Sequence, residues 1–212
     1  MRLKKFISAE ERKKLEAAVR EAEAKSSGEI VPAVVERSST YAWVGYRAAL
    51  LGWAVASLVA LWAHYYRPFL FEFWETQAMQ AGGLLLGWLF SRSRFALKIL
   101  VSGELMAEEV KEAAQAAFLK HGLANTRDRT GVLLFVSLKE HRVQILADSG
   151  IHEKVGEEFW RQESDRIAGS IRQGSPAEGM IAAIHSIGEK LQQHFPRKAD
   201  DRNELPNRLR TD

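Results

Sequence analysis

The sequence predicts a small α/β domain, with a mixed sheet flanked by helices, that is interrupted by a two-helix transmembrane hairpin. Three observations support this prediction. Residues 44–90 form a long apolar run, whereas the sequence on both sides is polar and regularly patterned. One strand-like segment precedes the run and two follow it. Amphipathic segments with helical spacing accompany these strands on both sides of the run.

The predicted α/β domain is therefore split in the sequence. Residues 1–43 and 92–195 form the domain, residues 44–91 form the hairpin, and residues 196–212 form a polar, loosely held C-terminal tail. The soluble part of the 212-residue chain is about the size of one small domain. The chain contains no cysteine, which excludes disulfides, zinc–thiolate sites and cysteine nucleophiles.

The first part of the domain is expected to hold one helix and one strand. Ser8 and Glu11 have the spacing of a capping box, so a helix begins there and continues to about residue 25. Residues 29–36 have the composition of a strand. Pro32 lies within it and cannot donate to a sheet ladder, which favours an edge or bulged position.

The apolar run is long enough for two membrane spans. Residues 46–66 form the stronger span, because about 20 residues cross ~30 Å of hydrocarbon. The second span begins near Glu75 and ends at residue 90, and the alternative for this segment is a re-entrant or interfacial helix. Basic residues flank the hairpin on its outer sides, while the short connection contains only Arg67. This distribution predicts that both termini are cytoplasmic. The flanking basic residues are Arg37, Arg47, Arg92, Arg94 and Lys98.

The second part of the domain supplies the remaining elements. The order of strand, helix and strand predicts a parallel pair joined by a right-handed crossover, and the last strand adds an antiparallel partner. The expected helices are residues 104–121, 153–173 and 176–194, and the expected strands are residues 132–138 and 142–147.

Three carboxylates are candidate metal ligands. Asp128 precedes the buried strand and Asp148 follows its antiparallel partner, so both are expected at the same end of the pair, with Glu153 close by. Carboxylates gathered in this way can hold a hard cation such as Ca²⁺ or Mg²⁺. The alternative is that Asp128 and Asp148 cap backbone N–H groups. Arg127 and Arg129 could bind a phosphate or neutralise the acidic residues.

Residues 125–151 resemble the centre of the TPM domain family. The shared features are an Arg-Asp-x-x-Gly loop, a Val/Leu strand, a short turn, an Arg-Val strand and a Gly-Ile helix start. The resemblance extends to residues 27–31 and 176–181, and residues 203–207 are similar to the membrane-protein branch of the family. The resemblance implies the TPM fold. Family members include thylakoid-lumen proteins linked to photosystem repair, and some are described as acid phosphatases or as binding calcium.

These observations favour a membrane-anchored TPM-domain protein that acts as an interaction or assembly module at a bacterial inner membrane. The alternative is a divalent-metal-dependent phosphatase, and the sequence leaves open whether the protein is an enzyme. The expected partners are the lipid bilayer and another membrane protein. Nucleic acid is not expected, because basic and aromatic residues do not alternate as they do in single-strand binders. The six histidines show no metal-binding spacing.

Overall fold

The computed structural model of the chain describes residues 6–66, 72–198, 200–201 and 203–211. The chain forms two compact units. The α/β domain comprises Met1–Ser39 and Ala107–Asp212, and the helical unit comprises Thr40–Met106. The helical unit is longer than the expected residues 44–91, because Tyr41 and Val44 pack with Val101 in a small apolar cluster of its own.

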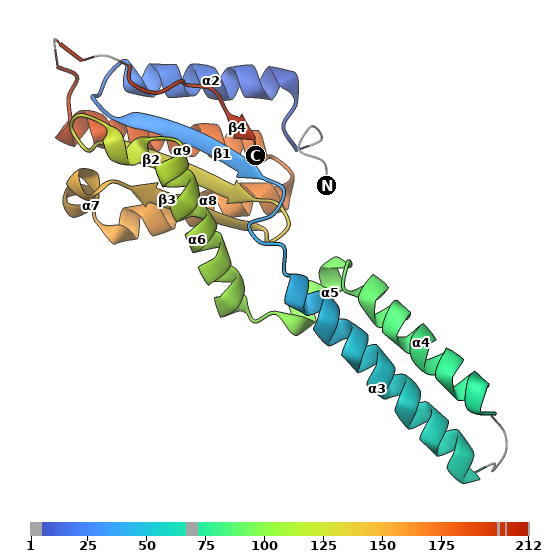
Figure 1. Cartoon of the computed structure of the whole chain (residues 1–212). Coiled ribbons are helices and arrows are strands. Elements are labelled where there is room, and N and C mark those ends of the chain that lie inside the picture. The colour runs from blue at the N-terminus through green and yellow to red at the C-terminus, as the bar shows by residue number, and fades with distance from the viewer. Residues whose placement is uncertain (1–5, 67–71, 199, 202, 212) are drawn as a thin grey trace. The chain divides into compact units, whose positions relative to one another are not determined.

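The α/β domain contains a mixed four-stranded sheet with the order β3-β2-β1-β4 (Figure 1). Strand β1 (Glu29–Val35) pairs in parallel with β2 (Gly131–Ser137), and β2 pairs antiparallel with β3 (Arg142–Ala147). The predicted parallel pair and antiparallel hairpin are therefore confirmed. Strand β2 is buried along its whole length, as expected for its continuous apolar sequence.

The fourth strand corrects two expectations. Residues 196–212 are not a loosely held tail, because β4 (Arg210–Thr211) pairs in parallel with β1 and Leu209 is only 5% exposed. Strand β1 consequently has a neighbour on each side, and its register with β2 has no bulge at Pro32. Proline is tolerated at position 32 because β4 pairs only with Ala33 and Val34. No residue of β4 would therefore accept a hydrogen bond from an N–H at this position.

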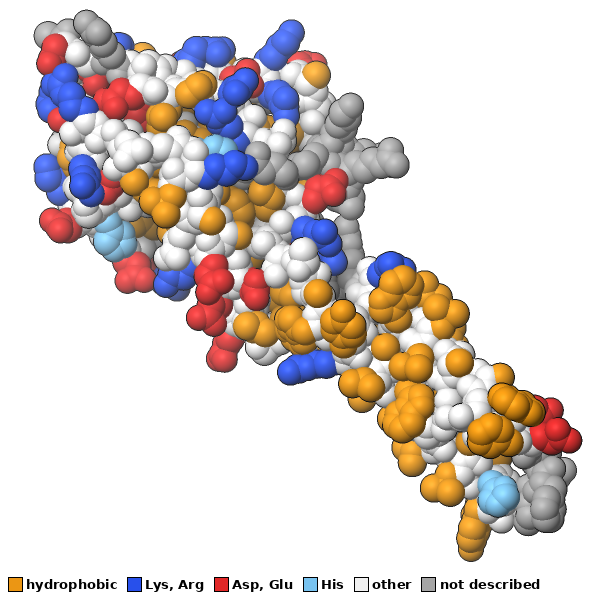
Figure 2. All heavy atoms as spheres, in the orientation of Figure 1, with side chains coloured by type: hydrophobic (Ala, Val, Ile, Leu, Met, Phe, Trp, Pro, Cys, Tyr) orange, Lys and Arg blue, Asp and Glu red, His pale blue; other side chains and the backbone are white. Residues whose placement is uncertain are grey.

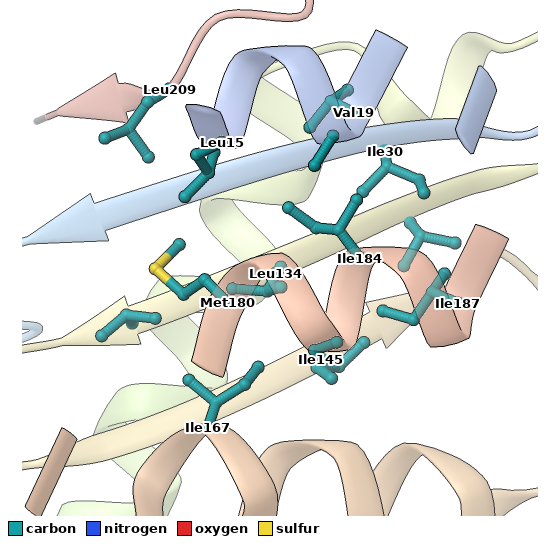
Figure 3. Close-up of a cluster of buried hydrophobic side chains, with 14 of the residues drawn as sticks. Leu15, Val19, Ile30, Leu134, Ile145, Ile167, Met180, Ile184, Ile187 and Leu209 are labelled. Carbon is teal, nitrogen blue, oxygen red and sulfur yellow. The ribbon is translucent and has the colours of Figure 1, made fainter. Parts of the chain in front are cut away.

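Helices cover both faces of the sheet. One face carries α2 (Ala9–Glu23), α8 (Glu157–Gln173) and α9 (Pro176–His194), and the other carries α6 (Gly103–Lys120). The predicted capping box of α2 is present, with the Ser8 hydroxyl accepting from the Glu11 amide at 3.2 Å. Figure 3 shows apolar side chains from α2, α8 and α9 converging on the strands. The labelled core residues are Leu15, Val19, Ile30, Leu134, Ile145, Ile167, Met180, Ile184, Ile187 and Leu209.

The helix expected over residues 153–173 is two helices in the structure. Helix α7 (Ser149–Val155) ends at Gly156, which has a φ of 84°, and α8 starts at the next residue. Residues other than glycine rarely adopt a positive φ, so Gly156 is the physical cause of the break. Glu153 lies inside α7 as a result and does not begin the long helix. The helix expected over residues 176–194 is confirmed as α9.

The helical unit is built from α3 (Ala42–Tyr66), α4 (Phe73–Phe90) and α5 (Arg94–Leu100). Helices α3 and α4 run antiparallel and approach so closely that a Cβ on Gly52 would overlap the carbonyl oxygen of Gly83. The Gln80 amide also donates to the Ser57 hydroxyl at 3.0 Å across this contact. Pro68, a residue type that ends helices, lies outside the described residues.

Among the described helices, α3 alone is long and apolar enough to cross a membrane by length and composition. Helix α4 has the expected extent, but the polar side chains of Glu75, Gln77 and Gln80 lie in its first half. By length and composition, the structure therefore supports α3 as one candidate span. Helix α4 packs against it.

Replacing Leu209 with alanine should test whether the C-terminal segment belongs to the core. We expect the free energy of unfolding to fall by about 2–3 kcal/mol, within the ~2–5 kcal/mol seen for Leu→Ala at buried sites. Urea denaturation of the full chain in detergent, followed by circular dichroism, measures this change. Arg208→Ala is the matched control, because the neighbouring Arg208 side chain is exposed and should contribute less than ~0.5 kcal/mol. Equal effects of the two changes would contradict the packing of this segment.

Candidate functional site

The loop before β2 is fastened to the start of β1. The Thr130 hydroxyl donates to the Ser27 carbonyl oxygen at 2.6 Å, and the Glu29 amide donates to the Thr130 carbonyl oxygen at 3.1 Å. Within the loop, the Thr126 hydroxyl accepts from the Thr130 amide at 3.2 Å. The Thr130 amide is therefore capped by Thr126 and not by Asp128.

The charged residues of this loop pair with the C-terminal segment. The Asp128 carboxylate lies 2.8 Å from Lys198 Nζ, and the Arg127 guanidinium lies 2.8 Å from the Asp200 carboxylate. The Arg127 backbone amide also donates to Glu204 at 3.1 Å. The Arg127 guanidinium lowers the pKa of Asp200. Both groups are well exposed, so solvent screens the pair and its main effect is to position the segment.

Asp148 differs from Asp128 in its burial and its partners. It is the N-cap of α7 and is 8% exposed; its Oδ1 accepts from the Ser149 amide at 2.6 Å. Its Oδ2 is buried and has no hydrogen-bond partner among the described residues. A Cβ on Gly150 would lie 3.0 Å from the Arg129 carbonyl oxygen, so the start of α7 lies against the loop that carries Asp128.

The structure does not gather the three predicted ligands into one group. Asp128 pairs with Lys198, Asp148 caps α7, and Glu153 is exposed on α7. Within the ranges that the structure describes, no three His, Asp or Glu side chains are placed to hold a metal ion together.

Two carboxylates beside the C-terminal segment, the buried Glu29 and the half-buried Glu23, are not indicated by the sequence. The Glu29 side chain is 7% exposed and accepts from the backbone amides of Glu204 at 2.9 Å and Leu205 at 3.3 Å. The Glu23 carboxylate accepts from the Ile30 amide at 3.0 Å and from the Asn207 side-chain amide. Three of these partners, Glu204, Leu205 and Asn207, lie 175 to 184 positions from the carboxylates that they bond. A charged tail that still contains Leu205 and Leu209 was the available signal that it packs on the domain.

A small cavity of about 120 Å³ lies beside these carboxylates and is lined largely by polar side chains. Burial raises the pKa of Glu23 to about 8, and the neighbouring Glu29 and Asp201 carboxylates add to the increase. Burial also raises the pKa of Glu29. Chemically, this arrangement binds backbone amides at the junction of β1 and the C-terminal segment. The lining residues include Arg20, Glu23, Ser26, Glu29, Arg197 and Asp201.

Comparison with known proteins identifies the class. The fold is a split α/β domain with a parallel strand pair, an antiparallel hairpin and helices on both faces. The model of the TPM domain family matches residues 86–190, about half of the chain, and this region includes β2, β3 and most of α6–α9. The chain therefore belongs to the TPM domain family, as the sequence resemblance predicted.

One solved structure supports the same fold. The NMR structure of the BA42 protein from the psychrophilic bacterium Bizionia argentinensis aligns with a TM-score of 0.62 and 22% identity. The alignment covers 100% of this chain and 99% of that chain. At this level of identity, the similarity establishes a shared fold. The comparison with curated proteins found no match.

The half-buried Glu23 should make the stability of the domain depend on pH. In the unfolded chain its pKa is 4.5, whereas in the folded domain it is about 8, so the folded state binds the proton more tightly. This contribution to stability is complete below pH 4.5 and is lost as the pH rises through about 8. We expect the unfolding temperature to fall between these pH values, measured by circular dichroism. Glu23→Gln keeps a neutral side chain and should flatten the dependence; an unchanged slope in this variant would contradict the assignment.

Proposed function

We propose that this protein is a membrane-anchored member of the TPM domain family and belongs to its membrane-protein branch. In this proposal, the α3–α4 pair spans the inner membrane of a bacterium, and the α/β domain is an interaction or assembly module on the cytoplasmic side. The observation that supports the anchor best is the exposed apolar surface of the helix pair. Only 22% of the apolar window of α3 is buried, unlike the core helix of a soluble protein.

The side chains around the helix pair have the distribution of a membrane segment. Figure 2 shows large apolar side chains along its surface with few charges between its ends. The exposed residues include Leu50, Leu51, Val55, Leu58, Leu61, Leu84, Leu85 and Leu86. Apolar patches of this extent are rare on soluble monomers and mark contact with a membrane or another protein.

Aromatic residues lie at both ends of the helix pair, where an interface is expected. At one end, the guanidinium of Arg47 lies 4.5 Å from the centre of the Trp43 ring, and that of Arg92 lies 3.6 Å from the Trp88 ring. The other end carries Trp62, Tyr65, Tyr66, Phe73 and Trp74, all of them exposed. Tryptophan and tyrosine concentrate at both interfaces of membrane proteins, and arginine reaches from the segment into the head groups.

The sheet supports the second span independently of hydropathy. Strands β1 and β2 pair directly, so the chain between them must return to the side that it left. If α3 crosses the bilayer, a second crossing must follow before β2, and α4 is the helix available for it. The 18 residues of α4 extend about 27 Å, close to the ~30 Å hydrocarbon core, and a small mismatch is accommodated by local thinning.

The interaction role is supported by the ion pairs of the charged loop before β2. Arg127 and Asp128 are paired with Asp200 and Lys198 of the same chain, so these groups are occupied by the protein itself. An arginine clamp for a phosphate would need to be released from this pairing first. Recovery of a membrane protein in a pull-down from detergent extracts is the expected result, and recovery of background alone would argue against the interaction role.

Reporter fusions test the proposed topology. A reporter enzyme that is active only outside the cytoplasm should be inactive when fused after Asp212 and active when inserted between residues 66 and 72. Activity at both positions would leave the domain outside and overturn the orientation. Activity of the reporter after Asp212 alone would also reverse the proposed orientation. Inactivity at both positions would exclude the hairpin.

The membrane anchor itself is tested by charge. Arginine at both Leu58 and Leu85 should release the protein from floated vesicles, because each charge at mid-membrane costs ~2.5–3.5 kcal/mol on insertion scales. Arginine at Tyr66 and Phe90, near the ends of the helices, is the matched control and should leave flotation nearly unchanged. Equal flotation of both double variants would contradict insertion.

A divalent-metal-dependent phosphatase is the second candidate, and the buried, unpaired Oδ2 of Asp148 favours it. If Ca²⁺ or Mg²⁺ binds there, a cation concentration about 100 times Kd should stabilise the full chain by ~2.7 kcal/mol. Asp148→Asn should abolish this stabilisation, and Glu153→Gln should not, since Glu153 is exposed and apart. Hydrolysis of a chromogenic phosphate that needs the cation and is lost in Asp148→Asn would support the enzyme. Stabilisation that is unchanged in Asp148→Asn would exclude this site.

A further inference from the structure

Helix α5, which follows the helix pair, has one covered and one uncovered apolar face. Ala96 is fully buried, and Leu100 packs against the small apolar cluster around Val44. Phe95 and Ile99 are each 72% exposed. Residues four positions apart lie on the same side of a helix, so Phe95 and Ile99 form an uncovered apolar strip. The covered face fixes α5 to the helical unit and leaves this strip available to something else.

The connection between α4 and α5 is short and bonded. The Ser93 amide donates to the Phe90 carbonyl oxygen at 2.8 Å, and the Ser93 hydroxyl accepts from the Ala96 amide at 3.1 Å. Only residues 91–93 separate the two helices, and α5 lies where α3 begins and α4 ends (Figure 1). In a hairpin that spans the membrane, this end of the helix pair lies in the head-group layer, and α5 lies at the same level.

The charges at this end of the helix pair have one sign. Residues 40–53 and 86–103 contain four basic residues and no Asp or Glu. Two of the four, Arg47 and Arg92, stack on tryptophan rings and form no ion pair with any residue that the structure describes. Stacking covers one face of a guanidinium and leaves the N–H groups at its edge free to donate to phosphate. This end is therefore complementary to an anionic surface.

The exposed apolar surface of the helix pair continues along the chain into α5. Leu89 and Phe90, the last residues of α4, are each 47% exposed, and the uncovered strip begins five residues later. A lipid layer that surrounds the helix pair therefore also reaches Phe95 and Ile99. The same layer supplies phosphate groups at the level of the basic residues, so one occupant accounts for both the apolar strip and the charge.

We propose that α5 is an interfacial helix that docks on the anionic phospholipids of the cytoplasmic leaflet. Phe95 and Ile99 enter the boundary between head groups and acyl chains, about 5–10 Å deep, as the apolar faces of surface-bound helices do. Arg47 and Arg92 pair with the lipid phosphates, because the cytoplasmic leaflet carries the negative surface potential. The inference rests on the membrane anchor proposed above and adds to it a third contact and a lipid class.

The depth of α5 can be measured with a single fluorescent label, because the chain contains no cysteine. Ile99→Cys carries the label on the uncovered strip, and Leu58→Cys carries it on the exposed surface of α3 as a control. The full chain is placed in vesicles of equal parts phosphatidylcholine and phosphatidylglycerol. A nitroxide near the head group should quench the Ile99 label about twofold more than one at the end of the acyl chain, as a depth of about 5–10 Å requires. The Leu58 label should show the reverse order.

The lipid class is tested with nitroxide lipids that differ only in the head group. Labelled phosphatidylglycerol should quench the Ile99 label about twofold or more relative to labelled phosphatidylcholine, since one arginine near an anionic surface favours it by up to about fivefold. Combining Arg47→Gln with Arg92→Gln should lower this preference. Arg47→Lys with Arg92→Lys is the matched control, because it keeps both charges and should keep the preference. Equal quenching by the two lipids, or a preference that survives the glutamine changes, overturns the anionic assignment.

The two labels separate failure of this inference from failure of the anchor. A deep Leu58 label together with an Ile99 label that responds only to a water-soluble quencher overturns the docking of α5 and preserves the anchor. Labels that both respond only to the water-soluble quencher overturn both. An Ile99 label that neither the nitroxide lipids nor the water-soluble quencher reaches would identify a protein, such as a second copy of this chain, as the occupant and overturn the lipid assignment.

Discussion

In the sheet, Glu29–Val35 pairs with Gly131–Ser137, so everything between these strands must leave the α/β domain and return to it. The long intervening segment costs less to close than its length suggests, because it is itself folded. Tyr41 and Val44 at its start pack against Val101 near its end. This small cluster brings the entry and the exit of the helical unit together, and the two strands need only be joined by two short connections.

The second edge of β1 is completed by three different means, and this explains why the C-terminal segment is folded. Ile30, Pro32 and Val34 are the residues of β1 that face away from β2, as the bond from the Glu29 amide to Thr130 indicates. The Glu23 carboxylate accepts the Ile30 amide, Pro32 has no amide hydrogen, and β4 pairs at Val34. Glu29 then fixes the segment that leads to β4 by accepting two of its backbone amides. Carboxylates in this region therefore act as receptors for backbone N–H groups.

Local signals in the sequence predicted most elements of the fold. The capping box at Ser8, the continuous apolar run of β2 and the helical spacing of α9 each depend on neighbouring residues, which a sequence displays directly. Gly156 was visible as a glycine, but no neighbouring residue in the sequence indicates that it adopts the positive φ that divides α7 from α8. The pairing of Asp128 with Lys198 joins residues that are 70 positions apart, and no local pattern indicates such a contact. The bonding of the candidate site residues accordingly could not be predicted from the sequence.

The position of Pro32 in β1 has a consequence for the order in which the chain is made. Residues 36–130 are synthesised between β1 and its partner β2, which takes roughly 5–20 s at usual rates of translation. During this interval β1 is an apolar strand without its neighbour, the kind of segment that joins wrong strands in other molecules. A proline in its centre denies such a strand one ladder bond, at a place where the native sheet needs none. Pro32 thus leaves the native sheet intact and makes the unpaired β1 a poorer template for strands of other molecules.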